Sequence, residues 1–390
     1  MKILFDYIVI GAGFAGTVIA ERIARVNNKK VLLIEKRNHI GGNAYDTYDR
    51  SGLLVHQYGP HIFHTKLKEV WDYLSEHTEW YLYHHKVLGK IDGKEVPIPF
   101  NLDSLDQLFP SEMAKRLEKK LIENFGFNVK VPILKLRDTQ DKDLQFLADY
   151  IYEKVFLNYT MKQWGLKPDE IDPYVTGRVP VYISRDDRYF QDPFQGIPKY
   201  GYTKLFESLL NHPNIKLMLN TNYKELIDID MKEKKIYFAE KEYTGKVIFT
   251  GKIDEFFQYK YGELPYRSLQ FQFDTIQEEH YQKVGTINYP NDYDFTRITE
   301  FKKITGQNHP YTTFVREYPV SYEKDVEGQN IPYYPIPKEE NHLIYKQYKK
   351  EASLYENVYF LGRLAEYTYY DMDAVVAKAL KVFRDKLSSK

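Results

Sequence analysis

The chain has 390 residues, of which 55 are Lys or Arg and 55 are Asp or Glu, so its formal net charge is zero. Nucleic acid and anionic membranes bind cationic surfaces, so this balance argues against either as the main partner. The sequence contains no cysteine, which excludes disulfides, thiolate metal sites and cysteine nucleophiles. No run approaches the roughly 18 apolar residues that a membrane span needs, and Asp6 interrupts the apolar start. We therefore expect a cytoplasmic protein with two or three domains.

Residues 6–37 predict a dinucleotide-binding βαβ unit. Its parts follow in the expected order: a strand over 7–10, the motif Gly11, Gly13 and Gly16, a helix over 17–25, a strand over 31–34, and Glu35. Gly11 makes the tight turn, Gly13 lets the backbone approach a pyrophosphate, and Gly16 lets the helix pack on the strand. The helix N-terminus attracts the diphosphate, and Glu35 can accept the hydroxyls of an adenosine ribose. The complete arrangement favours this interpretation over a glycine-rich turn in an ordinary α/β domain.

The stretch after Glu35 indicates which dinucleotide binds. It reads KRNHIGGNAYD, and Gly41–Gly42 resembles the second glycine pair of the large FAD-binding family that includes amine oxidases and phytoene desaturases. A dehydrogenase that uses only NAD usually lacks this pair, so FAD is the predicted cofactor. The candidate cofactor-binding residues of these segments and of a later one are Gly11, Gly13, Phe14, Gly16, Glu35, Lys36, Gly42, Asn43 and Tyr223.

The middle of the chain predicts a helical insertion over residues 101–175. Asn101 is a suitable N-cap for a helix that begins the stretch 101–126. Within 141–165, apolar residues recur at helical spacing. These residues are Leu144, Leu147, Ile151 and Val155.

Residues 176–196 and 262–344 change to short alternating runs separated by Pro, Gly and Asn, which is typical of antiparallel strands. With 81–100 they form the predicted substrate domain. The FAD-binding domain is then discontinuous, over 1–80, 197–261 and 345–390. The predicted fold class is α/β: a Rossmann-like FAD-binding domain with an inserted helical domain and an antiparallel β-sheet domain.

The C-terminal region predicts a strand over 358–361, then Gly362 and a helix from about Asp373. Asp371 or Asp373 would be its N-cap. In the FAD-binding family a helix at this place faces the flavin pyrimidine, where its dipole would stabilise a reduced, anionic flavin. A metal site on the two aspartates is the alternative. It would need both carboxylates in an open loop, and the segment runs directly into a helix, so we expect no metal.

Several arginines and tyrosines lie outside the dinucleotide motifs. Two separated arginines, Arg178 and Arg297, would suit a nucleoside diphosphate, because guanidinium groups bind phosphate oxygens in a bidentate manner. Tyr159 and Trp164 could stack on a base or a sugar. Taken singly, each arginine is explained as well by a surface or salt-bridge role.

The sequence as a whole resembles the bacterial UDP-galactopyranose mutase family from about residue 6 to residue 380. The motifs that carry the resemblance occur in the family's order: GAGFAG, EKRNHIGGNAYD, YGPHIFHT, NYTMKQWG, GRVPVY, FTRITEFK, YYP and LGRLAEYTYYDMD. The stretch 84–94 is harder to match, so base and sugar contacts there stay open.

The resemblance implies roles for named residues. Arg178, Arg297 and His64 would be the catalytic residues. The two arginines would hold the UDP diphosphate, and His64, otherwise a core histidine, would lie against the flavin near the sugar. Further substrate-binding residues would be Tyr159, Thr160, Trp164, Tyr189, Asn288, Tyr334 and Tyr369. Further FAD contacts would be His61, Ile62, Arg363, Tyr370, Asp371 and Met372.

The implied reaction is an isomerisation of UDP-galactopyranose to UDP-galactofuranose on reduced FAD, through a covalent adduct between flavin N5 and the sugar. UDP-galactose is the predicted substrate, and we expect a homodimer with no nucleic-acid partner. An FAD-dependent amine oxidase or desaturase is the alternative enzyme. A flavoprotein that only binds nucleotide sugars is the non-enzymatic alternative.

Overall fold

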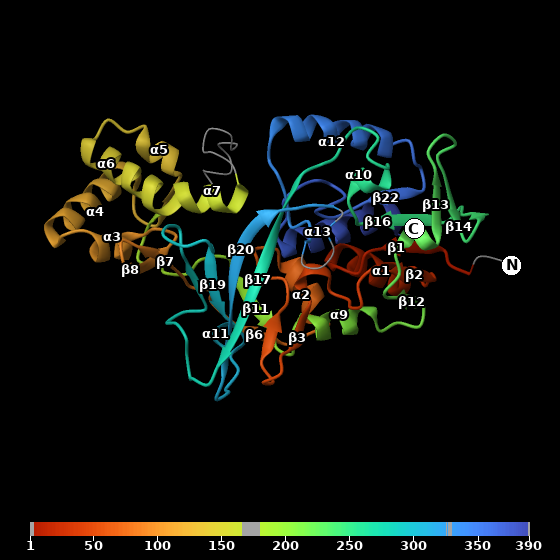
Figure 1. Cartoon of the computed structure of the whole chain (residues 1–390), viewed down its shortest axis with the longest axis horizontal. Helices are drawn as coiled ribbons and strands as arrows, with labels where there is room; N and C mark the ends of the chain where they lie inside the picture. Colours follow the sequence, from red (N-terminus) through yellow and green to blue (C-terminus); the bar gives the residue numbers. More distant parts are fainter. Residues whose placement is uncertain (1–3, 166–179, 325, 327–329, 389–390) are drawn as a thin grey trace.

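The computed structural model describes residues 4–165, 180–324, 326 and 330–388. One end of the molecule is a small parallel sheet covered by helices, and the other end is a group of helices (Figure 1). A larger sheet with two long strands lies between them. Arg178 falls outside the described residues.

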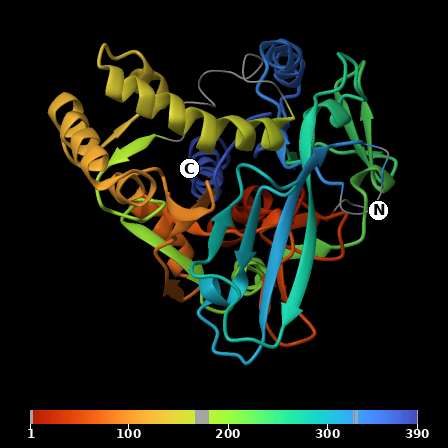
Figure 2. The ribbon, with the colours of Figure 1, turned by 60° about the vertical axis from the view of Figure 1, so that its left-hand side comes forward.

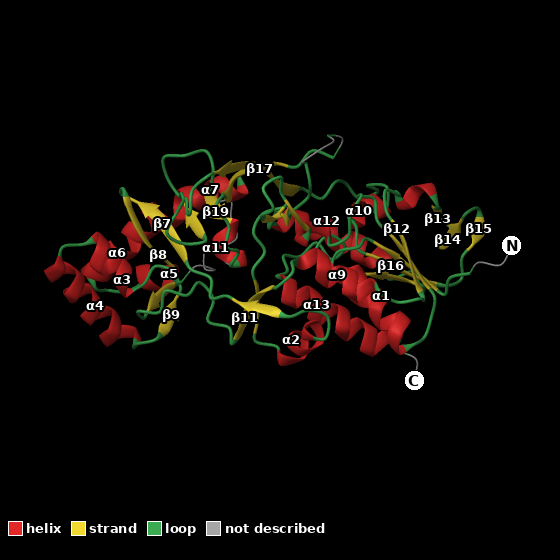
Figure 3. Ribbon diagram, turned by 90° about the horizontal axis from the view of Figure 1, so that it is seen from below, coloured by secondary structure: helices red, strands yellow, loops and turns green. Residues whose placement is uncertain are grey.

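The five-stranded sheet is parallel throughout, in the order β12 (Ile215–Met218), β2 (Val31–Ile34), β1 (Tyr7–Ile10), β16 (Lys246–Phe249) and β22 (Val358–Phe360). Strands that are buried on both faces read as continuous apolar runs, and β1 and β2 are buried along their whole length. Figure 3 shows α1 (Phe14–Val26) beside α13 (Met372–Val382), with α9 (Tyr202–Leu210) along α1. The predicted strands 7–10 and 31–34 are confirmed.

The opposite face of this sheet packs on residues from α10 (Ile253–Phe256) and α12 (Glu339–Ala352). The predicted helix over 17–25 begins three residues earlier, at Phe14, because Gly13 already holds the N-cap position. The glycine motif is therefore partly helical. The Rossmann-like fold class is confirmed.

Small sheets surround this domain. They are a hairpin of β3 (Asp46–Tyr48) and β4 (Leu54–His56), a sheet of β5 (Phe63–Thr65), β11 (Phe194–Pro198) and β6 (Trp80–Leu82), and a sheet of β13 (Ile227–Asp230), β14 (Lys235–Phe238) and β15 (Lys241–Glu242). Helix α2 (Lys68–Ser75) follows β5.

The seven-stranded sheet forms the middle of the molecule. Its order is β21 (Tyr334–Pro335), β17 (Tyr266–Ile276), β20 (Thr312–Ser321), β19 (Arg297–Glu300), β18 (Thr286–Asn288), β7 (Val87–Ile91) and β8 (Lys94–Ile98). The short helix α11 (Phe301–Thr305) follows β19. The sheet is antiparallel, as predicted, at its other described pairs, but β18 and β7 are parallel. These two strands lie far apart in the sequence, so no tight hairpin fixes their relative direction.

The helical part comprises α3 (Leu102–Leu108), α4 (Ser111–Phe125), α5 (Ile133–Arg137), α6 (Lys142–Ile151) and α7 (Asn158–Trp164). A π-helical turn (Tyr152–Leu157) joins α6 to α7, and Figure 2 shows this rod crossing above the long strands. Asn101 is confirmed as the N-cap of α3, since its side chain accepts a hydrogen bond from the Ser104 backbone nitrogen at 3.0 Å. The four apolar positions predicted to share one helix face are buried.

Strand β10 (Val181–Ile183) was predicted to belong to the sheet of the substrate domain, but it is not part of the seven-stranded sheet. It pairs with β9 (Val129–Val131) beside the helices, and β11 pairs with β5 and β6. Within the described ranges, no helix is long and apolar enough to cross a membrane.

Candidate functional site

Two adjoining cavities lie between the five-stranded and seven-stranded sheets. We call them the dinucleotide cavity, of about 780 Å³, and the substrate cavity, of about 480 Å³. Residues that line both are Asn43, Tyr58, His61, Arg363 and Met372. A ligand that fills the first cavity therefore reaches the second.

The glycines of the dinucleotide cavity allow close backbone approach. A Cβ atom on Gly16 would lie 1.9 Å from the carbonyl oxygen of Gly11, and one on Gly42 would lie 2.9 Å from Gly13 Cα. The first turn of α1 contains no acidic residue, so the positive end of its dipole is not neutralised there. This arrangement fits a diphosphate.

Glu35 is buried at the end of β2, 6% exposed. Its Oε2 accepts a hydrogen bond from the Ala12 backbone nitrogen, and its Oε1 accepts one from the Arg37 backbone nitrogen, each at 2.9 Å. Each carboxylate oxygen has a second lone pair that can accept a ribose hydroxyl. Glu35 thus fixes the glycine loop and can still hold a dinucleotide.

Arg37 also lines the dinucleotide cavity, although the sequence analysis did not select it. Its Nη2 donates to Asn43 Oδ1 at 2.9 Å, and its guanidinium lies 4.7 Å from the centre of the Tyr58 ring. Its Nη1 is buried and has no hydrogen-bond partner in the described part of the chain. A buried cationic donor of this kind fits an anionic ligand. The signal in the sequence was a basic residue two positions after Glu35.

The structure brings most of the predicted cofactor-binding residues together. Those that line the dinucleotide cavity are Gly11, Gly13, Phe14, Glu35, Lys36, Gly42, Asn43, His61, Tyr223, Arg363, Tyr370 and Met372. Ile62 and Asp371 line only the substrate cavity, and Gly16 packs behind Gly11. The residues present fit FAD.

Asp371 holds the N-cap position of α13, one of the two alternatives predicted. Its side chain makes no capping hydrogen bond; it lines the substrate cavity instead. The Asp373 carboxylate accepts a hydrogen bond from the Ala374 backbone nitrogen at 2.7 Å. Among the residues with described positions, no group of three or more His, Asp or Glu side chains is arranged to hold a metal ion.

All the predicted substrate-binding residues that the structure describes line the substrate cavity. They are Tyr159, Thr160 and Trp164 on α7, Tyr189, Asn288 on β18, Arg297 on β19, Tyr334 on β21, and Tyr369. His64 on β5 lines it as well.

Arg297 is the predicted diphosphate-binding arginine that the structure describes, and it lines the substrate cavity. Its Nε donates to Glu317 Oε1 at 2.7 Å, and the two residues are direct partners on β19 and β20. Burial lowers the pKa of Arg297. The electrostatic effects of Glu317, Tyr159 and Tyr334 raise it by more, so the pKa lies well above its usual value. Within the described chain only Nε of this guanidinium is hydrogen bonded, so Nη1 and Nη2 can bind an anion.

A cluster of aromatic rings and one arginine closes the cavity near α13. The rings of Tyr334 and Tyr369 stack with centres 5.6 Å apart, and the Arg363 guanidinium lies 5.0 Å from the centre of Tyr369. Arg363 donates to the carbonyl oxygens of Tyr333 and Tyr370. Burial raises the pKa of Tyr334 to about 12, so its phenol stays protonated and can donate to a phosphate oxygen.

His61, which lines both cavities, is held in one tautomer. Its Nδ1 donates to the Gly59 carbonyl oxygen at 2.7 Å, so its Nε2 is an acceptor. Burial lowers the pKa of His61 to about 3, which keeps the ring neutral. Its backbone nitrogen donates to Nδ1 of the fully buried His56 at 3.0 Å.

His64 lies in a second fixed arrangement. Its Nδ1 is 2.6 Å from Asp192 Oδ2, and its ring stacks on Phe190 with centres 3.6 Å apart. His64 was predicted from the sequence, whereas Asp192, which is 128 positions away, was not. His64 does not line the dinucleotide cavity, so its place against the flavin stays a prediction.

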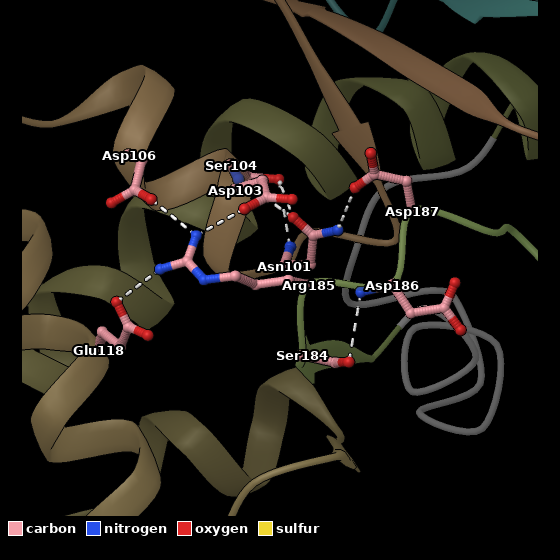
Figure 4. Close-up of polar contacts among 9 residues, drawn as sticks. All are labelled: Asn101, Asp103, Ser104, Asp106, Glu118, Ser184, Arg185, Asp186 and Asp187. Atoms are coloured by element: carbon pink, nitrogen blue, oxygen red, sulfur yellow. Dashed lines mark hydrogen bonds and ion pairs between the residues drawn. The ribbon is translucent and has the colours of Figure 1, made fainter.

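The segment that carries Tyr189 into the cavity is fastened to the helical part (Figure 4). Arg185 binds the carboxylates of Asp103, Asp106 and Glu118 at 2.5, 2.7 and 2.8 Å. Asn101 Nδ2 donates to Asp187 Oδ1 at 3.0 Å. We call these contacts the Arg185 cluster, and they tie residues 185–187 to α3 and α4.

Comparison with known proteins adds a family. The UDP-galactopyranose mutase family matches residues 154–369, and the NAD(P)-binding Rossmann-like domain matches residues 9–77. A UDP-galactopyranose mutase from Mycoplasma genitalium is 36% identical over 98% of this chain and 95% of its own length. A dTDP-fucopyranose mutase from Escherichia coli is 36% identical over 96% of both chains.

A crystal structure of reduced UDP-galactopyranose mutase has the same fold, with a TM-score of 0.74 and 17% identity over 99% of this chain and 96% of that one. The family match covers more than half of the 390 residues, and the curated relatives align over nearly the full length. The chain therefore belongs to the UDP-galactopyranose mutase family.

Proposed function

We propose that this protein is a flavin-dependent isomerase that interconverts UDP-galactopyranose and UDP-galactofuranose. The observation that carries the proposal is the position of Arg297. This charged guanidinium lines a cavity that shares five lining residues with the FAD-sized dinucleotide cavity. A sugar diphosphate bound to Arg297 would place its sugar beside the cofactor.

Reduced FAD would be held by the glycine loop, Glu35 and Arg37, and when bound it supplies a nucleophilic nitrogen at the anomeric carbon. The protein's own task is to help the nucleoside diphosphate depart and return. Arg297, with the phenols of Tyr334 and Tyr369, is placed to stabilise the charge that develops on the departing phosphate. We propose that Arg178 and Tyr189 add to this contact.

The other substrate contacts are proposals from the same cavity. Tyr159 and Trp164 lie on one helix and line the cavity, and we propose that their rings stack on a base, while Thr160 and Asn288 would contribute polar atoms. The Trp164 ring meets the Tyr334 ring edge-on, with ring centres 6.1 Å apart. The residues proposed to bind the base therefore lie next to those proposed to bind the diphosphate.

The direct test is equilibration of UDP-galactofuranose with the holoenzyme after reduction by dithionite. We expect UDP-galactopyranose to accumulate with the reduced enzyme and not with the oxidised enzyme, as followed by chromatography. Hydrogen peroxide formation from an added amine would instead support the predicted alternative, an amine oxidase or desaturase. Tight binding of UDP-galactose without turnover would support a binding protein.

A dTDP-linked 6-deoxy sugar is a second candidate substrate, because the dTDP-fucopyranose mutase is as similar in sequence as the UDP-galactopyranose mutase. The two candidate substrates differ in the base, the ribose 2′-hydroxyl and the sugar C6 hydroxyl. Comparing kcat/KM for the two with the same reduced preparation decides between them.

We also propose that the protein acts in the cytoplasm as a homodimer. The absence of cysteine from all 390 residues is compatible with a reducing compartment. Light scattering of the purified holoenzyme tests the oligomeric state, and fractionation of the source cells tests the compartment.

A further inference from the structure

Among the residues lining the substrate cavity, His64 is held by two contacts that together leave one side of its ring available. Its Nδ1 is 2.6 Å from Asp192 Oδ2, and Phe190 covers one ring face at 3.6 Å. A carboxylate accepts hydrogen bonds, so this contact fixes a proton on Nδ1, and in the neutral ring the lone pair is then on Nε2. Such a histidine can take up and return a proton at Nε2.

The loop that carries Phe190 and Asp192 is itself fixed. The Gln195 side chain, 3% exposed, donates to the backbone carbonyl oxygens of Phe190 and Asp192 at 3.0 and 2.8 Å. Gln195 is also the direct partner of His64 where β11 pairs with β5. The His64 ring, the Asp192 carboxylate and the Phe190 ring are therefore held together as one unit.

Asp192 does not line the substrate cavity, whereas His64 does. The carboxylate and imidazole side chains are 15% and 16% exposed, so both are shielded from bulk water. Two cations also lie near Asp192: Lys66, whose Nζ lies 3.8 Å from Oδ1 and whose side chain is 78% exposed, and Lys130, which lines the substrate cavity and whose charge Asp192 favours. Asp192 therefore acts on a bound ligand through neighbouring side chains, and the cavity-lining residue that it hydrogen bonds is His64.

The proposed isomerisation requires a proton to move. When the six-membered ring opens, the C1–O5 bond breaks, its electron pair stays on O5, and O5 takes up a proton. When the five-membered ring closes, an O4 lone pair forms the C1–O4 bond and O4 loses its proton. The net change transfers one proton from O4 to O5 and leaves the oxidation level of the sugar unchanged, so no oxidant or reductant is consumed.

We propose that His64 Nε2 carries this proton between O4 and O5, and that Asp192 is the positioning residue that fixes the required tautomer. The inference rests on the proposed function, because it needs a sugar ring in the substrate cavity. His64 has no proposed role in the departure of the diphosphate. Arg297 and the tyrosines are proposed to assist that step. Loss of His64 should therefore affect ring closure and spare the departure.

The test uses the reduced holoenzyme and UDP-galactopyranose with an ¹⁸O label in the oxygen that bridges C1 and the β-phosphate. Departure and return of UDP move the label to non-bridging positions, which mass spectrometry or ³¹P NMR detects. Formation of the furanose reports ring contraction. Wild type, His64→Ala and Asp192→Asn are compared, with Lys66→Ala as the control that removes the exposed ion pair with Asp192.

We expect kcat for conversion to fall roughly 100-fold or more in His64→Ala and about 10-fold or more in Asp192→Asn. The rate of label exchange in His64→Ala and in Asp192→Asn should stay within about threefold of the wild-type rate. The kcat of Lys66→Ala for conversion should stay within about twofold of the wild-type value. Added imidazole should restore conversion by His64→Ala, because the stacking site on Phe190 is then open. A purely structural role would give no such rescue.

Wild-type kcat in Asp192→Asn would overturn the inference. So would a parallel loss of exchange and conversion in His64→Ala, or a failure of imidazole to rescue it. If the wild-type holoenzyme itself shows neither exchange nor conversion, the proposed function fails and this inference fails with it.

Discussion

Glu317 holds Arg297 by a hydrogen bond of 2.7 Å from Nε, across adjacent antiparallel strands of the large sheet. The carboxylate is 1% exposed, and the guanidinium lines the substrate cavity. This pairing orients the arginine before any ligand arrives, since the guanidinium is planar and a hydrogen bond at Nε fixes the direction of both terminal nitrogens. The proposed diphosphate site is thus built into the sheet.

Replacing Arg297 with alanine should leave FAD bound and nearly abolish turnover. Arg297 lines only the substrate cavity, so the flavin contacts stay intact. Removing a preorganised cation at the leaving group costs roughly 100- to 1,000-fold in kcat. Visible absorbance of the variant measures bound flavin, and chromatography measures conversion. Loss of flavin from the variant would contradict the assigned role.

Glu317→Gln should tighten the binding of UDP. The amide oxygen can still accept the hydrogen bond from Arg297 Nε, but the neutralising charge is removed. A less neutralised guanidinium attracts the diphosphate more strongly, by roughly 1 kcal/mol or about fivefold in Kd. Titration calorimetry with UDP measures the change, and Arg297→Lys should weaken binding in the same assay. Weaker binding in Glu317→Gln would show that orientation matters more than charge.

Arg37→Met should reduce the affinity for FAD. The buried Nη1 of Arg37 has no partner among the described residues, so a bound anionic cofactor is its expected acceptor. Loss of a charge-assisted hydrogen bond corresponds to roughly 10- to 100-fold in affinity. Flavin fluorescence titration measures the constant. Arg50→Met, at an exposed position, is the control that should retain wild-type affinity. Equal affinities in both variants would contradict the assignment.

Much of this site could be predicted from local sequence. The glycine motif and Glu35 are read within one βαβ unit, and Asn101 with Ser104 is a capping pair three residues apart. The roles of Asp192 and Glu317 could not be predicted from local sequence. Each acquires its partner only when strands meet, at separations of 128 and 20 residues, and nothing near either residue in the sequence marks it.

The direction of β7 against β18 could not be predicted either, because no hairpin joins them. The start of α1 was placed too late for a different reason. The predicted helix began after the last glycine of the motif, whereas the helix already includes Gly16. A Cβ on Gly16 would lie 1.9 Å from the Gly11 carbonyl oxygen, so its absence is what allows this close packing.

Arg185→Ala should weaken the attachment of the Tyr189 segment. The guanidinium bridges three carboxylates of α3 and α4, but it is 44% exposed, so we expect a loss of only about 1 kcal/mol in the free energy of unfolding. The KM for the sugar nucleotide should rise while bound flavin stays constant. Urea unfolding and steady-state kinetics check both parts. Arg137→Ala, which removes one exposed ion pair with Asp149, is the control.

His56 should make stability depend on pH. Burial lowers the pKa of His56 to about 3, against an ordinary value of 6.5. Between these values the unfolded chain binds a proton that the folded chain does not, so stability is complete above 6.5 and falls as the pH falls. His56→Asn should reduce the slope by ~1.4 kcal/mol per pH unit. Its amide oxygen can replace Nδ1 as acceptor for the His61 nitrogen.

Urea unfolding between about pH 5 and about pH 7.5 measures this slope. The control is His84→Asn, because His84 is exposed and its ring meets water in both the folded and unfolded states. An unchanged slope in His56→Asn would mean that the ring is protonated in the folded protein.

The central claim is that a nucleoside diphosphate bound to Arg297 brings its sugar against a reduced flavin at the junction of the two cavities. A crystal structure of the reduced holoenzyme with UDP tests this most directly. We predict phosphate oxygens within hydrogen-bonding distance of Arg297 and Tyr334, and the flavin ring between Asn43, His61 and Arg363. UDP bound away from Arg297, or a flavin ring that does not reach the substrate cavity, would contradict the account.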